Sequence, residues 1–460
     1  MNLTMARTKK AGQHISLCLL VLFVLVSRST SLAEPSIFPL MPADYFAEPQ
    51  DLPFDEDILE KGSEVGWHWT EFRFTSLIHN GDSIRVRALF AVPDQANAQN
   101  KAPLILATHG IFGFIRAMSA EKKADPRYWS AVTDLVNAGY AVMFFDWEPT
   151  FAIQAAGKPL PEHPRFTTYG KLDYSTSDGW WPVSNDFKDS LYYQVVMAGR
   201  RALTWAGAQP EVDASRVGVW GASYGGIFSS LLAAVDPRIT AAAPTVYTAR
   251  FGQNEEYYNG LPKHWSEQQA LAFRARFDSE HLLRKRSLPI LYTVSTNDAA
   301  FSVLKANECF ATLQQPKHLL INANQGHDFW NFGQTVMFFD YALRGRGERP
   351  EIGPLQAKLK DSLVTASVNT NGSAVEFYFT PEIPKPEIAA DQRTLPQAWT
   401  WIKMEGIKQA DGSFRAEWNL PADAPEPIQR VHVFASVTMS SKVVECSPIV
   451  TLEIKKFSLE

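Results

Sequence analysis

The fold of this chain is decided by the stretch Val217-Gly218-Val219-Trp220-Gly221-Ala222-Ser223-Tyr224-Gly225-Gly226. Its first four residues form an apolar run that predicts a strand, and residues 227–234 predict a helix. Between them stands a Gly-x-Ser-x-Gly turn, whose glycines let strand and helix approach closely while the serine takes a strained backbone conformation. The hydroxyl would lie at a helix N-terminus, which favours developing negative charge. We predict Ser223 to be a nucleophile; the alternative is a structural serine in a glycine-rich turn.

A serine nucleophile needs a base and an orienting acid, which follow it along the chain in motifs of this kind. The strand predicted over 289–294 leads into a loop that carries Asp298, and the strand predicted over 317–321 leads into a loop that carries His327. Both loops are expected to converge on the serine, so we predict Asp298 as the acid and His327 as the base. Weaker candidates, placed by the local pattern in turns, strands, an insertion or too close to His327, are His264, His281, His318, Asp236, Asp278 and Asp328.

Acyl transfer also needs donors for the oxyanion. One is expected to be the backbone N–H of Tyr224, and the other that of Ile111, after the sharp turn that Gly110 allows. We interpret His109 as a loop residue that shapes this turn rather than as a second base or metal ligand. The sequence has no His, Cys and acid set with metal-ligand spacing and no phosphate-loop or dinucleotide motif, so no metal or cofactor is predicted.

Several tryptophans fall in loops that would surround this site. Trp330 follows His327 by three residues, and Trp181 and Trp265 lie in predicted insertions. Such rings suit the flat face of a sugar, and packing under a long loop is an equally good explanation for any one of them. Trp330 and Trp181 are the predicted substrate-binding residues, with Trp330 the better candidate.

The wider pattern predicts an α/β fold. From 67 to 347, short apolar runs alternate with helical patterns, which indicates β-α-β units and a mainly parallel sheet flanked by helices. The expected strands cover 104–108, 141–145, 217–220, 239–243, 290–294 and 318–321, preceded by a hairpin whose turn is Asn80-Gly81.

We divide the chain into an irregular leader over 34–62, a catalytic domain over 63–347 and a β-sandwich accessory domain over 351–460. The leader is rich in proline and acids, and the segment 345–350 mixes glycine, charge and proline, as domain linkers do. Beyond it, alternating runs such as 375–379 and 431–435 are separated by turn residues, which is typical of a small sandwich. We expect this third region to supply no catalytic residue.

Residues 1–33 are expected to be a signal peptide. A positive segment with Arg7, Lys9 and Lys10 precedes an apolar core over 15–26, which is shorter than the roughly 20 residues needed to span a bilayer. Ser31-Leu32-Ala33 is a small-x-small cleavage site. The sequence thus predicts a secreted or periplasmic protein without a stable membrane anchor.

Composition limits the partners. The chain has 460 residues and a net charge of −5; loss of residues 1–33 removes four cations and no acid, which leaves 40 Lys and Arg against 49 Asp and Glu, a net charge of −9. With no basic block, no nucleic acid partner is expected. Cys309 and Cys446, in different predicted domains, are interpreted as separate buried thiols, with a disulfide as the alternative.

The segments 106–110 and 212–226, with the loops of Asp298 and His327, resemble the α/β-hydrolase superfamily over roughly residues 60–345. The chain is similar to its acetyl xylan esterase and dienelactone-hydrolase-like branch, which overlaps with prolyl oligopeptidase catalytic domains. The resemblance implies a Ser223–His327–Asp298 triad with an oxyanion hole from Ile111 and Tyr224. It departs after Asp146, where an insertion to about Trp181 changes the loops that face the substrate.

The sequence therefore favours an exported serine hydrolase of carboxylic esters, on small molecules or on a polysaccharide of the acetyl xylan type. One alternative is a serine peptidase of the prolyl oligopeptidase type, although no propeller-sized domain precedes the catalytic region. Another is a catalytically inactive exported protein that binds a glycan or a partner.

Overall fold

The computed structural model describes residues 41–110, 126–147, 187–249, 261–262, 264–314, 316–383, 396–424 and 427–454. Residues 38–460 belong to one compact unit. The predicted signal peptide, Ile111 and Trp181 lie outside the described residues. No helix among the described residues is long and apolar enough to cross a membrane.

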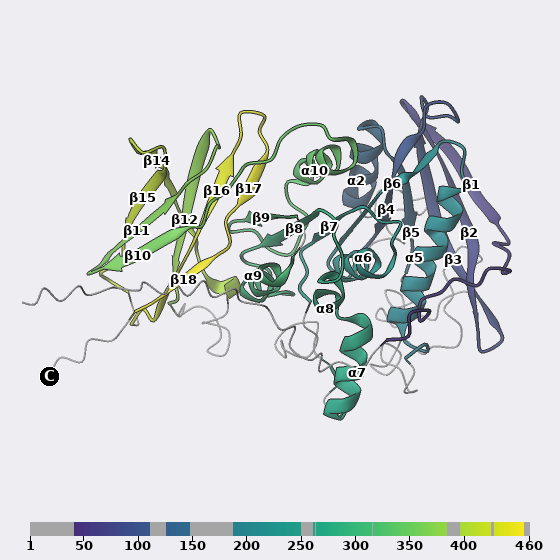
Figure 1. The fold of residues 1–460 in the computed structure, drawn as a ribbon, viewed down its shortest axis with the longest axis horizontal. Helices are drawn as coiled ribbons and strands as arrows, with labels where there is room; N and C mark the ends of the chain where they lie inside the picture. Colours follow the sequence, from purple (N-terminus) through teal and green to yellow (C-terminus); the bar gives the residue numbers. More distant parts are fainter. Residues whose placement is uncertain are drawn as a thin grey trace, which may run out of the picture. The chain divides into compact units, whose positions relative to one another are not determined.

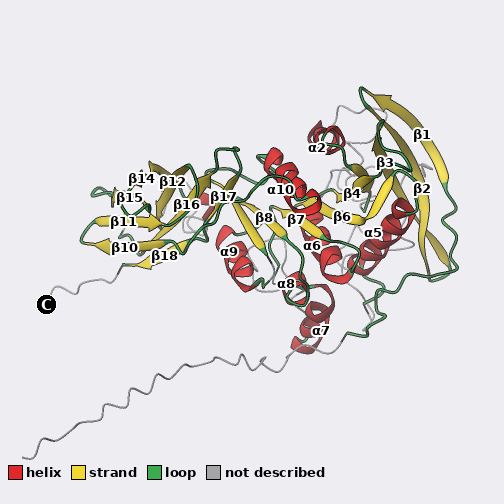
Figure 2. Ribbon diagram, turned by 45° about the horizontal axis from the view of Figure 1, so that its top comes forward, coloured by secondary structure: helices red, strands yellow, loops and turns green. Residues whose placement is uncertain are grey.

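A nine-stranded sheet dominates the first part of the chain (Figures 1 and 2). Its strand order is β1-β2-β3-β5-β4-β6-β7-β8-β9. The first three strands are antiparallel, and the strands from β5 to β9 in this order pair in parallel. The bounds are β1 Asp57–Glu64, β2 Trp67–His79, β3 Asp82–Pro93, β4 Ala102–Thr108, β5 Ala141–Phe145, β6 Val212–Ala222, β7 Ala241–Thr245, β8 Ile290–Ser295 and β9 Lys317–Asn322.

Helices cover both faces of this sheet. The helices are α2 Pro126–Asn137, α5 Leu191–Gly207, α6 Tyr224–Val235, α7 Glu267–Phe277, α8 Ser279–Leu283, α9 Val303–Thr312 and α10 Phe332–Arg344. Side chains alternate along β4: Leu104 and Leu106 join one apolar cluster with α5 and α6, while Ile105 and Ala107 join another with α2 and α10. Figure 1 shows α2 and α10 together on one side of the sheet. The α/β prediction is confirmed.

The sequence predicts an irregular leader over 34–62, and this prediction is wrong for the last part of that segment. Residues 57–64 form β1, which pairs with β2 along its length. A shift of register between Ile58 and Glu60 breaks the alternation that would have indicated a strand. The hairpin of β2 and β3 does turn at Asn80-Gly81, where both residues have a positive φ, 51° and 84°.

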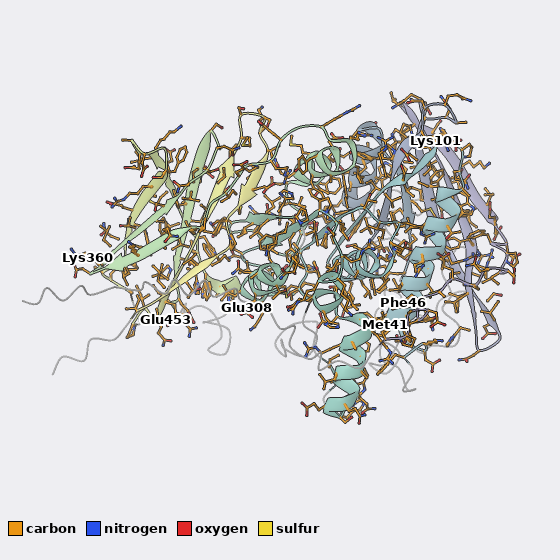
Figure 3. All side chains as sticks on the ribbon, in the orientation of Figure 1. Met41, Phe46, Lys101, Glu308, Lys360 and Glu453 are labelled. Carbon is orange, nitrogen blue, oxygen red and sulfur yellow. The ribbon has the colours of Figure 1, made fainter. Side chains whose placement is uncertain are left out.

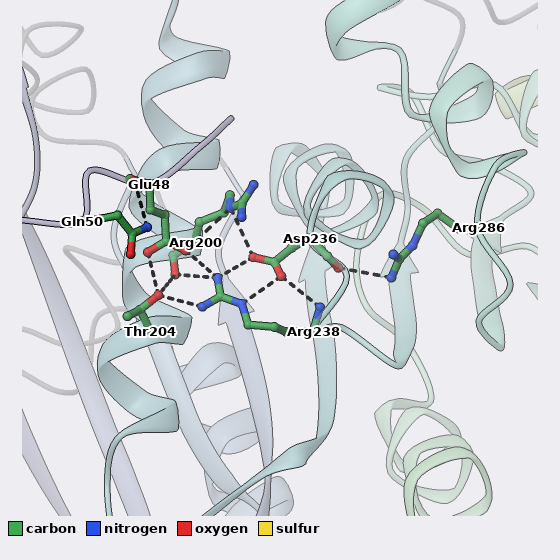
Figure 4. Close-up of polar contacts among 7 residues, drawn as sticks. All are labelled: Glu48, Gln50, Arg200, Thr204, Asp236, Arg238 and Arg286. Carbon is green, nitrogen blue, oxygen red and sulfur yellow. Dashed lines mark hydrogen bonds and ion pairs between the residues drawn. The ribbon is translucent and has the colours of Figure 1, made fainter. Parts of the chain in front are cut away.

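The leader is also tied to α5 and to the turn after α6 by a network of charges (Figure 4). Glu48 accepts hydrogen bonds from Arg238 at 2.8 Å and from the Thr204 hydroxyl at 2.6 Å. Arg238 also binds the carboxylate of Asp236, which is fully buried where α6 ends, and Arg200 approaches the same carboxylate at 3.3 Å. In the same leader, Phe46 (Figure 3) stacks on Tyr193 of α5. Asp236 is therefore fixed in a structural turn, away from Ser223.

Residues 356–453 form two antiparallel sheets around a third apolar cluster. One sheet has the order β10-β11-β15-β14; the other has the order β13-β12-β16-β17, with β18 also paired to β16. The bounds are β10 Gln356–Lys360, β11 Leu363–Val368, β12 Ala374–Pro381, β13 Ile402–Glu405, β14 Ile407–Lys408, β15 Phe414–Asn419, β16 Arg430–Thr438, β17 Val444–Cys446 and β18 Val450–Glu453. The smaller all-β region is confirmed, whereas the domain boundaries stay predictions.

Candidate active site

Ser223 stands at the sharp turn between β6 and α6. Its backbone has φ 62° and ψ −124°, a region that a residue with a side chain seldom adopts. The turn is tight enough to require glycine: a Cβ at Gly221 would collide with the Gly225 carbonyl, and one at Gly225 would come within 2.6 Å of the Thr108 carbonyl oxygen. This geometry holds the serine hydroxyl at the N-terminus of α6.

The three residues predicted to act together lie in hydrogen-bond contact. The Ser223 hydroxyl and Nε2 of His327 are 2.8 Å apart, and Nδ1 of His327 is 2.8 Å from Oδ2 of Asp298. Asp298 is almost fully buried, whereas the His327 side chain is 31% exposed. The ring thus meets the carboxylate on its inner side and the serine on its outer side, as a base between an acid and a nucleophile requires.

Asp298 is fixed by the backbone of its own loop. Its Oδ1 accepts hydrogen bonds from the amides of Ala300 at 2.7 Å and Phe301 at 2.9 Å, which leaves Oδ2 for His327. The loop follows β8, and the His327 loop follows β9. Because β8 and β9 are parallel neighbours, their carboxyl ends bring the acid and the base to the same edge of the sheet.

The oxyanion donors are only partly described. Tyr224 is the first residue of α6 and directly follows Ser223, the N-cap, so its backbone N–H belongs to the N-terminal end of the helix. The loop after β4 lies beside the serine, since a Cβ at Gly110 would come within 3.0 Å of the Ser223 Cβ. The Gly110 amide donates a hydrogen bond to the Tyr128 hydroxyl at 2.7 Å. Ile111 lies outside the described residues, so its role stays a prediction.

His109 belongs to a second histidine–carboxylate pair. Its Nε2 lies 2.9 Å from Oδ1 of Asp146, and its Nδ1 lies 2.6 Å from the Gly110 carbonyl. The ring is fully buried and stacks on Trp147 at 5.3 Å. Both ring nitrogens are occupied, so this histidine shapes the turn after β4, as interpreted, rather than offering a base to a substrate.

The weaker candidates are placed elsewhere. Asp328 pairs with Arg127 at 3.1 Å, His318 pairs with Glu445 at 2.8 Å, and Asp278 caps α8. His264 is exposed, and His281 lies in α8. Among the described residues, no group of three or more His, Cys, Asp or Glu side chains is arranged to hold a metal ion. Cys309 and Cys446 are buried and not joined in a disulfide.

Trp330 borders an open pocket next to the base. The pocket has a volume of about 470 Å³ and runs between α2 and the segment that follows His327; its lining includes Arg127, Asp134, Asp328, Phe329 and Trp330. Trp330 is 42% exposed, and its indole N–H donates to the Gly326 carbonyl at 3.1 Å. Trp265 instead packs against Phe187 and Phe273, and Trp181 lies outside the described residues.

Two features of the site were not predicted from the sequence. The first is the Tyr128 hydroxyl, which accepts a hydrogen bond from the Gly110 amide and lies on α2, a helix that carries no recognisable motif. The second is a pair of contacts from Asn297 and Asn324, in the acid and base loops, to the backbone of residues 399–401. The only sequence signal for the second is the density of asparagine in loops beside the triad. That density has no unique structural meaning, because asparagine is common in turns.

Comparisons with known proteins find one family match and several similar solved structures. Residues 193–337 match the prolyl oligopeptidase family. Acetyl xylan esterases from Paenibacillus sp. R4 and Thermoanaerobacterium sp. JW/SL YS485 are each 18% identical, cover 64% of this chain and are covered to 90%, with TM-scores of 0.49 and 0.47. A glucuronoyl esterase from Solibacter usitatus is 17% identical, with 66% and 88% covered and a TM-score of 0.46.

The sheet order, the strained serine between β6 and α6 and the family match point the same way. The residues matched by the family include β6, which ends just before the serine, the helix α6 that follows it, and the loops of Asp298 and His327. The chain thus has a fold of the α/β-hydrolase type, and its residues 193–337 are similar to the prolyl oligopeptidase family.

Proposed function

We propose that the protein is an exported serine hydrolase that cleaves carboxylic esters through an acyl-enzyme on Ser223. The observation that carries the proposal is the continuous hydrogen-bonded line from the Ser223 hydroxyl through both nitrogens of His327 to Asp298. Each residue presents the atom that its role needs, and the buried carboxylate is already held by two backbone amides.

The reaction proceeds in two halves. Nε2 of His327 takes the hydroxyl proton as Ser223 Oγ attacks the ester carbonyl, and the oxyanion is stabilised by the Tyr224 amide and by the loop after Gly110. The imidazolium then gives its proton to the leaving alcohol as the ester C–O bond breaks. Water repeats the sequence on the acyl-enzyme: His327 takes its proton, and the returning proton restores Ser223 as the acid leaves. Asp298 keeps the tautomer and orientation of the ring.

An acylated polysaccharide of the acetyl xylan type is the proposed carrier of the ester. The open pocket with Trp330 is lined by Asp328, the residue that follows the base, and an exposed indole suits a sugar face. Export supports the same choice, because polymers must be attacked outside the cytoplasm. The resemblance to acetyl xylan esterases is the reason for naming acetyl as the first acyl group to test.

A serine peptidase is the second candidate, and the match of residues 193–337 to the prolyl oligopeptidase family favours it. The two candidates share the acyl-enzyme and differ in the leaving group, an alcohol against an amine. Turnover of proline-containing peptides at a higher kcat/KM than aryl acetates would favour the peptidase and overturn the ester proposal.

The test is a substrate panel on the exported protein, with aryl acetates, acetylated xylan and proline-containing peptides. Labelling with a fluorophosphonate, followed by mass spectrometry of the modified peptide, should find the label on Ser223 and lose it in Ser223→Ala. An unlabelled but folded protein that turns over none of the panel would contradict the proposal and favour a binding protein. N-terminal sequencing of the exported protein tests cleavage after Ala33.

A further inference from the structure

We propose that the C-terminal β region is a positioning element for catalysis, acting through a brace made of residues 399–401 that grips the loops of Asp298 and His327. The inference rests on the proposed function, since it concerns how these two residues are held. It extends the expectation that residues 351–460 supply no catalytic residue. In this proposal the C-terminal region holds two catalytic residues in place, Asp298 and His327.

Each loop contributes one asparagine to the brace. Asn297, next to the acid, donates through Nδ2 to the Trp399 carbonyl at 2.7 Å. Asn324, three residues before the base, donates to the Trp401 carbonyl at 2.9 Å and accepts from the Trp401 amide at 2.8 Å. The second contact satisfies both ends of one carboxamide with one backbone unit, which fixes direction as well as distance.

The acid and base loops are also tied to each other. The Thr296 hydroxyl accepts from the Asn324 amide at 2.7 Å, and the Asn297 amide donates to the Gln325 carbonyl at 2.9 Å. A shift of either loop therefore moves the other, and the brace grips both. The pair His327–Asp298 is held at the centre of a network whose outer anchor belongs to the C-terminal region.

The anchor itself is well buried. Trp399 and Trp401 are each 2% exposed and join the large apolar cluster of the hydrolase sheet. Trp399 stacks on His432 at 4.4 Å, Trp401 packs on Phe434 at 5.0 Å, and the Thr380 hydroxyl donates to the Thr400 carbonyl between them. Because this segment is locked on β12 and β16, the asparagines bind a fixed backbone rather than a loose loop.

The His327 side chain is 31% exposed, and its ring lies 5.8 Å from that of Phe301, measured between centroids. Catalytic groups must be held within about 0.5 Å of the productive geometry, and a misplacement of about 1 Å costs about 100-fold in rate. An anchor three residues from the base is close enough to matter on that scale.

The structure offers a matched control. Asn307, in α9, makes the same two-sided contact to the C-terminal region, donating to the Ile449 carbonyl at 3.2 Å and accepting from the Ile449 amide at 2.8 Å. Asn307 lies outside the loops that carry Asp298 and His327. We compare Asn324→Gly with Asn307→Ala in the full-length protein. Glycine is chosen at position 324 because Asn324 has a φ of +56°, which glycine adopts without strain.

Asn324→Gly should lower kcat for an aryl acetate about 10- to 100-fold with KM changed less than about twofold, while Asn307→Ala keeps kcat within about twofold of the wild type. Both should lower the melting temperature. Equal kcat losses in the two variants, or an unchanged kcat in Asn324→Gly, would overturn the proposal. Should Asn324→Gly fail to fold, Asn297→Ala takes its place under the same criteria; it removes the hydrogen bond to the Trp399 carbonyl together with the one accepted from the Thr296 hydroxyl.

A readout without substrate separates this inference from the proposed function. The proton between Nδ1 of His327 and Asp298 should give a low-field resonance, assigned by its absence in His327→Ala. We expect it to broaden or vanish in Asn324→Gly and to persist in Asn307→Ala. Its persistence in Asn324→Gly contradicts the brace even if the wild type hydrolyses esters; a wild type inactive on the panel contradicts only the proposed function.

Discussion

Two histidine–carboxylate pairs lie on either side of Ser223, and they are built alike. His109 and Asp146 follow the parallel neighbours β4 and β5; His327 and Asp298 follow the parallel neighbours β9 and β8. Their nitrogen–oxygen distances are 2.9 and 2.8 Å. The difference lies in the second ring nitrogen: in His109 it faces the Gly110 carbonyl, and in His327 it faces the serine hydroxyl.

Exposure follows the same division. The side chains of the first pair are 1% and 0% exposed, whereas the second histidine is 31% exposed beside a buried acid. We call His109–Asp146 the closed pair and His327–Asp298 the open pair. No substrate reaches the closed pair, so its role is structural, whereas the open pair can exchange a proton with a bound molecule. Proximity of histidine to carboxylate is thus not in itself a sign of catalysis.

The largest expected effect breaks the open pair. His327→Ala should lower kcat for an aryl acetate by at least about 10³-fold, because the serine loses the group that accepts its proton. The fold should survive, as the ring is partly exposed. Steady-state kinetics and thermal unfolding check both halves of this expectation, and a kcat within tenfold of the wild type would refute the assignment of the base.

Breaking the closed pair should have the opposite signature. His109→Ala leaves the buried Asp146 without its histidine and should lower the free energy of unfolding by about 3–5 kcal/mol. The folded fraction should keep far more activity than His327→Ala does. Urea unfolding and kinetics normalised to labelled Ser223 measure the two effects. A greater loss of activity at His109 than at His327 would reverse the two roles.

A smaller effect tests whether the open pair faces a substrate groove. Trp330→Ala should raise KM for an acetylated polysaccharide by up to about tenfold, which corresponds to one lost stacking contact of about 1.4 kcal/mol. Trp330→Phe, which keeps a ring but not the hydrogen bond to Gly326, is the control and should retain most of the affinity. Equal KM values in all three proteins would remove Trp330 from substrate binding.

The smallest expected effect concerns the buried thiol of Cys446, which should differ from an exposed thiol in its reactivity. Burial raises the pKa of Cys446 to about 12, so it should stay protonated and unreactive toward a thiol reagent at pH 8 until the protein unfolds. In the unfolded chain the thiol ionises near pH 8.5. Above that pH the unfolded state releases a proton that the native state keeps, and Cys446 should therefore lower stability as the pH rises. Rapid labelling of Cys446 in the native protein would contradict its enclosure.

The elements that carry the site are predictable from local sequence patterns. Apolar runs predicted the parallel strands closely, because strands buried on both faces are continuously apolar. The Gly-x-Ser-x-Gly stretch located the serine, and the ends of two later strands located Asp298 and His327. Such patterns failed at β1, where a bulge interrupts the alternation of an acidic edge strand, and they were silent on the Tyr128 anchor.

Which histidine is exposed, and which residues hold it, depends on contacts between distant parts of the chain. Asp146 and His109 are 37 residues apart, and Asn324 and Trp401 are 77 residues apart, so no local pattern connects them. Sequence periodicity encodes which face of an element is buried, but the partner of a polar loop side chain is set by how distant strands converge. The closed pair and the brace on residues 399–401 exist because parallel strands end at one edge and a second sheet packs beside it.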